Sequence, residues 1–142
     1  MNNTEQIEQE PLIILSEHVV YDPLKRTLSR GKKTINLSEN ESCLLKLLLN
    51  KTSSKREIMY EIWEKRGTIV TESSYYKLVR QLRLSFKKME LDENLIMTLP
   101  RVGILYTGTK SEASHALFNH QKKGVYSYIQ CFFQKVFNRT IL

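Results

Sequence analysis

The spacing of apolar and polar residues predicts a long amphipathic helix in the second half of the chain. Between residues 71 and 88, apolar residues recur at the i, i+3, i+4, i+7 and i+11 spacing of one helical face. These residues are Tyr75, Leu78, Val79, Leu82 and Phe86. We therefore expect a helix over residues 72–88 that packs through this face, with Thr71, Ser73 or Ser74 capping its start.

Two further helices are predicted ahead of it. Ser38 and Glu41 have capping-box spacing and open onto a leucine-rich run, so the first helix should be buried on most of its circumference. The serine pair at 53–54 starts the second helix, which we expect over residues 55–65. Ile58, Ile62 and Trp63 supply its packing face.

Short β-prone runs flank the three helices. They lie at residues 12–15, 18–22, 25–30 and 33–37 before the helices, and at 95–100 and 104–109 after them. Leu28, Ile35 and Leu37 are the inward candidates of the early runs, and a tight turn at 101–103 joins the late runs into a hairpin. The sequence therefore predicts an α+β fold with an N-terminal antiparallel sheet, three helices and a C-terminal β-hairpin.

The remaining segments are polar or amphipathic. We expect residues 1–11 to be a disordered arm, 12–109 a single domain, 110–121 a linker and 122–142 an aromatic tail. Apolar residues recur in the tail at helical spacing, namely Val125, Ile129, Phe132, Phe133, Val136 and Phe137. Three interpretations stay open: an interfacial membrane helix, a dimerisation or partner helix, and a segment that packs back on the domain or remains from a longer chain.

Charge is distributed unevenly along the chain. The net charge is +7, yet residues 1–22 hold five acids and no Lys or Arg, which leaves +12 for the rest. Such a basic body favours a polyanion, either nucleic acid or an anionic membrane surface. The basic face of the 72–88 helix fits a DNA major groove, and an ordinary solvated surface is the alternative.

Catalytic and metal-binding motifs are not found. The sequence contains no GxxxxGK, GxGxxG, HExxH or GxSxG, and its three histidines are scattered, so we expect no enzyme, no metal and no other cofactor. Cys43 and Cys131 are far apart and outside any ligand-like spacing. We expect a reducing cytoplasmic location, with the inner-membrane surface as the alternative if the tail attaches there.

Residues 19–106 resemble the OmpR/PhoB-type winged-helix domain of bacterial regulators, in the style of the CadC, ToxR and HilA branch. The matching segments are INLSENESCLLKLLLN (35–50), REIMYEIWEKRGTIVTESSYYKLVRQLRLSF (56–86) and LIMTLPRVG (95–103). The resemblance implies a winged helix-turn-helix that binds double-stranded promoter DNA in a transcriptional regulator. RNA polymerase and a second copy of the chain are further candidate partners. The rival function is a protein-interaction or membrane-surface adaptor that acts through residues 122–142.

The resemblance also implies which side chains contact DNA. The third helix enters the major groove, where Arg80 can pair with guanine and Gln81 with adenine, and the hairpin acts as a wing near a flanking phosphate or minor groove. The implied contact residues are Ser73, Ser74, Tyr76, Lys77, Arg80, Gln81, Arg83, Lys87, Thr98 and Arg101.

Alternative roles remain open for some of these residues. Arg83 could pair with Glu57, Glu61 or Glu64 of the second helix, and Lys87 could complement the negative end of its own helix. The wing departs from the family pattern, which usually ends on arginine-glycine-tyrosine. Here the corresponding residues are Val102, Gly103 and Ile104, with Tyr106 as the candidate replacement for the missing aromatic.

Overall fold

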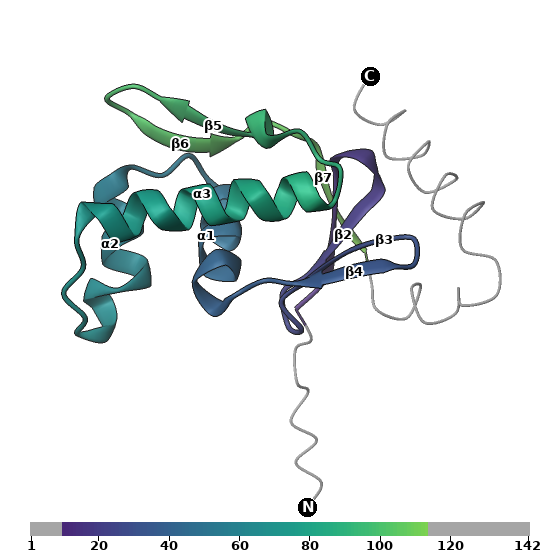
Figure 1. Ribbon diagram of the computed structural model, residues 1–142, viewed down its shortest axis with the longest axis horizontal. Helices are drawn as coiled ribbons and strands as arrows, with labels where there is room; N and C mark the ends of the chain where they lie inside the picture. The colour runs from purple at the N-terminus through teal and green to yellow at the C-terminus, as the bar shows by residue number, and fades with distance from the viewer. Residues whose placement is uncertain (1–9, 114–142) are drawn as a thin grey trace, which may run out of the picture.

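The computed structural model describes residues 10–113, which form three helices and two antiparallel sheets (Figure 1). The elements are β1 (Leu12–Leu15), β2 (Val19–Asp22), β3 (Thr27–Arg30), β4 (Lys33–Asn36), α1 (Glu39–Asn50), α2 (Lys55–Ile62), α3 (Glu72–Lys88), β5 (Ile96–Leu99), β6 (Gly103–Tyr106) and β7 (Lys110–Ala113). The predicted α+β class is confirmed. The expected tail, and the expected arm up to residue 9, lie outside the described residues.

The N-terminal sheet has five strands in the order β4-β3-β2-β1-β7. Its last strand corrects the expected linker, because Lys110–Ala113 pair antiparallel with β1 and place Ala113 opposite Leu12. The sequence Lys-Ser-Glu-Ala carries little β-propensity of its own. Hydrogen bonding to the free edge of β1 therefore makes this segment a strand, and the domain extends at least to Ala113.

The main core lies between one face of this sheet and the helices. Leu15, Val19, Tyr21 and Leu28 project from the strands into one buried cluster with leucines and isoleucines of α1, α2 and α3. Of the three predicted inward residues, Leu28 and Leu37 are buried, whereas Ile35 is half-buried because β4 is the edge strand.

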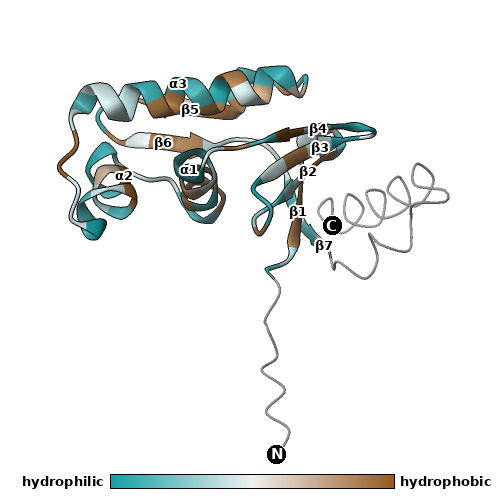
Figure 2. Cartoon of the chain, turned by 60° about the horizontal axis from the view of Figure 1, so that its bottom comes forward, coloured by the Kyte–Doolittle hydropathy of each residue, from teal (hydrophilic) through white to brown (hydrophobic). Residues whose placement is uncertain are grey.

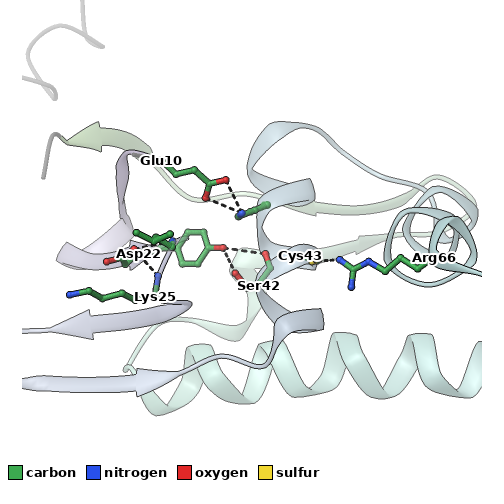
Figure 3. A network of polar contacts seen from close by, with 9 residues as sticks. Glu10, Asp22, Lys25, Ser42, Cys43 and Arg66 are labelled. Carbon is green, nitrogen blue, oxygen red and sulfur yellow. Dashed lines mark hydrogen bonds and ion pairs between the residues drawn. The ribbon is translucent and has the colours of Figure 1, made fainter. Parts of the chain in front are cut away.

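A tyrosine hydroxyl fixes the sheet to α1. The Tyr21 hydroxyl donates to the Ser42 carbonyl at 3.2 Å and also bonds to the Ser42 hydroxyl (Figure 3). Burial raises the pKa of Tyr21 to about 12, because the phenolate would have to form without water around it. On the far side of α1, half-buried Cys43 accepts a hydrogen bond from Arg66 at 3.5 Å.

The helix starts follow the predicted caps, whereas one helix end does not. Ser38 and Glu41 form the expected capping box of α1, and Ser54 with Glu57 forms a second box at the start of α2. The α-helix α2 ends at Ile62 rather than at residue 65. A 3₁₀ turn over Glu64–Arg66 follows, and the Gly67 N–H closes it on the Glu64 carbonyl at 2.9 Å.

Candidate nucleic-acid interface

The long helix α3 separates its apolar and polar residues as the sequence predicts. Tyr75, Leu78, Val79, Leu82 and Phe86 are all buried. Among the three candidate caps, Thr71 is the N-cap, and its hydroxyl accepts the Ser74 N–H. The ribbon of α3 accordingly alternates between hydrophobic and hydrophilic colours (Figure 2). One face of α3 is thus held in the core, while the other is open to solvent.

The open face of α3 carries cations without acidic partners. Among residues 10–113, no ion pair involves Lys77, Arg80 or Lys87. Two cations beyond the end of α2 are paired instead: Lys65 lies 3.2 Å from Glu61, and Arg66 lies 3.0 Å from Glu39. Uncompensated charge on one helix face creates a positive surface that attracts anions.

A buried carboxylate fixes the position of α3 against α1. The Glu41 side chain accepts the Ser85 hydroxyl at 2.6 Å and the Ser38 N–H at 2.9 Å. One carboxylate therefore completes the cap of α1 and holds the C-terminal half of α3. The sequence predicts only the capping role of Glu41, because hydrogen bonds between distant helices leave no local pattern.

At its N-terminal end, α3 meets the start of α2 around an exposed aromatic ring. Tyr76 is 58% exposed, and the Lys55 ammonium lies 5.8 Å from the centre of its ring. The Lys55 ammonium also forms a 3.1 Å ion pair with Glu72, and this hydrogen-bonded pair raises the pKa of Lys55. Lys55 has no signal in the sequence, because only the packing of α2 against α3 brings the ammonium to this face.

Arg83 makes contacts within the protein that the sequence did not predict. Its guanidinium donates to the Ile96 carbonyl at 3.0 and 3.1 Å and to the Thr98 hydroxyl at 2.8 Å. Among the three acids proposed as partners, Glu57 pairs with Lys51 and Glu61 pairs with Lys65. Arg83 forms no ion pair within residues 10–113, so the alternative pairing with α2 is not formed. The side chain connects α3 to the β5–β6 hairpin.

The β5–β6 hairpin also rests on the connection between α1 and α2. The Ser53 and Ile104 backbones exchange hydrogen bonds of 3.0 and 2.9 Å. Gly103 has a φ of +150°, and a Cβ atom there would lie 2.1 Å from the Ser53 carbonyl oxygen. Only glycine permits this approach.

The β5–β6 hairpin has an exposed tip and a last residue that packs against α3. The Val102 N–H bonds to the Leu99 carbonyl at 3.1 Å, and exposed Arg101 takes a φ of +66° at the third turn position. The Tyr106 ring packs edge-on against the Phe86 ring, and the two ring centres lie 6.4 Å apart. Tyr106 was expected to replace the aromatic residue that the family pattern has near the end of the wing, and this packing agrees with that role.

A groove of about 390 Å³ separates the helix ends from the hairpin. Three cations line it: Lys55 and Arg56 from α2, and Arg101 from the hairpin tip. Tyr76 forms part of the same wall, so the groove continues onto the open face of α3. The surface is therefore an exposed cationic helix beside a basic groove.

No family model and no curated protein matches this chain. Two solved structures share its arrangement of elements. The DNA-binding domain of Escherichia coli CadC is 21% identical over 74% of this chain and 99% of that chain, with a TM-score of 0.60. The DNA-binding domain of the response regulator AdeR, in complex with an intercistronic region, is 15% identical over 62% and 92%, with a TM-score of 0.52. The chain therefore shares the winged-helix fold of these two domains.

Within this winged helix, the predicted contact residues divide into three groups. Tyr76, Lys77, Arg80, Gln81 and Lys87 lie together on the exposed side of α3, beside Ser73 and half-buried Ser74. Arg101 lies at the tip of the wing, while Arg83 and Thr98 bond to each other between wing and helix. No helix within residues 10–113 combines the length and apolar content needed to cross a membrane.

Proposed function

We propose that the chain is a bacterial transcriptional regulator that binds double-stranded promoter DNA in a sequence-specific way. The observation that carries this proposal is the open face of α3, where Lys77 and Arg80 have no acidic partner among residues 10–113. An α-helix fits the major groove, and cations without internal partners are free to pair with phosphates and bases.

In this mechanism α3 reads the base edges. Arg80 and Gln81 are neighbours on the exposed face, where a guanidinium suits guanine and a carboxamide suits adenine through paired hydrogen bonds. Lys77 and Lys87 approach phosphates on the two sides of the groove. Phosphate neutralisation supplies most of the affinity, and the two base contacts supply most of the discrimination.

The basic groove takes the DNA backbone between the helix and the wing. Lys55, Arg56 and Arg101 line it from both sides, so a phosphate in the groove meets cations from two elements. The Arg83 bonds to Ile96 and Thr98 fix the wing relative to α3. The surface is therefore organised before DNA arrives, and little entropy is lost in shaping it.

The fold comparison supports this proposal. The AdeR domain, which has the same fold, was solved in complex with an intercistronic region. A regulator of this kind acts in the cytoplasm at the nucleoid. RNA polymerase and a second copy of the chain are the proposed protein partners.

The proposal is tested by selecting bound duplexes from a random DNA pool with the full chain, then titrating the selected site at rising salt. We expect Arg80→Ala with Gln81→Ala to weaken binding to this site by roughly 10- to 100-fold and to flatten the preference at two or more base positions. Lys65→Ala is the control, since it removes one cation from the 3₁₀ turn after α2, where Lys65 pairs with Glu61. Selection of no preferred sequence, or unchanged binding by the double variant, would contradict the proposal.

A further inference from the structure

The N-terminal sheet has a second buried face that the helices do not share. Leu12, Ile14, Val20 and Ala113 form a separate apolar cluster, which we call the outer-face cluster. Leu12 lies opposite Ala113 and Ile14 opposite Val20, so all four side chains project from the same side of the sheet. Within residues 10–113, this cluster contains no residue of α1, α2 or α3.

The composition of this face is that of a contact surface. A sheet that packs on one side usually presents polar residues on the other. Here the four apolar side chains are only 3, 4, 6 and 9% exposed. Around them, the same face carries half-buried Ser29 and Ser111 and exposed Thr34. An apolar centre with a polar rim is typical of surfaces that bind another element.

We propose that residues 122–142 of the same chain cover the outer-face cluster. The described chain leaves the sheet at Ala113, which is itself part of the cluster, and 29 residues follow it. Eight extended residues between 113 and 122 span up to roughly 28 Å, so the tail can return across the sheet. Its apolar residues from Val125 to Phe137 recur at helical spacing, and one helix stripe covers neighbouring strands about 4.8 Å apart.

Size and connectivity favour the chain's own tail over a second copy. A stable dimer interface buries about 800 Å² on each partner, from about 20 to 30 residues. The outer-face cluster has four residues from three strands, which suits a single helix. A short linker also gives an attached segment an effective concentration on the order of millimolar, which a separate molecule reaches only at very high concentration.

A spin label on the tail tests this placement in the full chain. Cys131 accepts the nitroxide after Cys43→Ser removes the other thiol. At about 100° per residue, Cys131 falls opposite the apolar stripe of the tail, so the label leaves that stripe intact. We expect the methyl signals of Leu12, Ile14 and Val20 to lose most of their intensity, whereas that of Ile69, on the α2–α3 connection, keeps its intensity.

Two variants and a mixed sample make the result decisive. Phe132→Ser with Phe133→Ser should restore the outer-face signals, while Gln134→Ser with Asn138→Ser, on the opposite side of the predicted helix, should not. Mixing isotope-labelled chains with separate spin-labelled chains should produce no broadening. Broadening only in the mixture would assign the face to a second copy. Unaffected outer-face signals, or signals lost only with anionic vesicles, would also overturn the proposal.

Discussion

Arg83 of α3 and Thr98 of β5 are joined by a 2.8 Å hydrogen bond from the guanidinium to the threonine hydroxyl. Two further bonds run from the same guanidinium to the Ile96 carbonyl. A planar guanidinium holds three bonds in one fixed orientation, which the ammonium of lysine cannot reproduce. This half-buried side chain therefore helps to fix the wing against α3.

Replacing Arg83 by lysine separates its geometry from its charge. We expect Arg83→Lys to lower the free energy of unfolding by about 1 kcal/mol and to weaken binding to the selected DNA site. Urea denaturation and a DNA titration measure the two effects. Arg80→Lys is the control for stability, because Arg80 is exposed and makes no hydrogen bond or ion pair within residues 10–113. Equal stability of wild type and Arg83→Lys would contradict the assigned role.

Glu72 is expected to restrain DNA binding. It is the acid in the first turn of α3, and its ion pair occupies the Lys55 ammonium. Glu72→Gln removes one anion from the proposed DNA-binding surface and frees that ammonium. We expect tighter binding at low salt and a salt dependence steeper by up to about 0.9 per added phosphate contact. Glu61→Gln frees Lys65 instead and should change neither quantity. Weaker binding by Glu72→Gln would contradict this expectation.

The contact between Gly103 and Ser53 predicts different costs for two glycine substitutions. Gly103→Ala should lower the free energy of unfolding by about 3 kcal/mol or more, because it combines a backbone clash with an unfavourable φ. Gly67 has a φ of +81°, but a Cβ atom added there would meet no other atom within 4 Å, so Gly67→Ala should cost only about 1 kcal/mol. Thermal and urea unfolding of both variants measure the difference, and equal costs would contradict the contact.

Tyr21 should make stability fall at high pH. Its pKa is about 12 in the folded protein and 10.0 in an unperturbed side chain. Between these pH values the unfolded chain loses a proton that the folded protein keeps, so this contribution is complete below pH 10 and is lost as pH rises through 12. We expect the stability advantage of wild type over Tyr21→Phe to shrink by about 1 kcal/mol between about pH 9 and pH 11. Urea titrations at the two pH values measure it, and an unchanged advantage would contradict it.

The fold was largely predictable because its signals are local. The apolar stripe of α3 and the Ser38–Glu41 capping box each lie within a single helix and its first flanking residue. The strand β7 was missed, since its partner β1 is far away in the sequence and its own composition resembles a linker. The end of α2 was placed too late because the sequence does not separate an α-helical turn from a 3₁₀ turn.

Only the α3 part of the candidate site was predictable from the sequence. Periodicity identifies which α3 residues face outward, so Lys77, Arg80 and Gln81 could be placed from sequence alone. Periodicity does not say which distant side chain reaches the same place. Lys55 was therefore overlooked, and the bonds of Arg83 to the hairpin were not predicted.

The pairing of β7 with β1 also sets an order for folding during synthesis. Leu12 is among the first described residues to leave the ribosome, and its partner Ala113 is the last of them. The hairpins β1–β2 and β3–β4 can form early, because their strands are close in sequence. The far edge of β1 stays unpaired until the whole winged helix has been translated. Completion of the sheet is therefore a late step, of the long-range kind that slows folding.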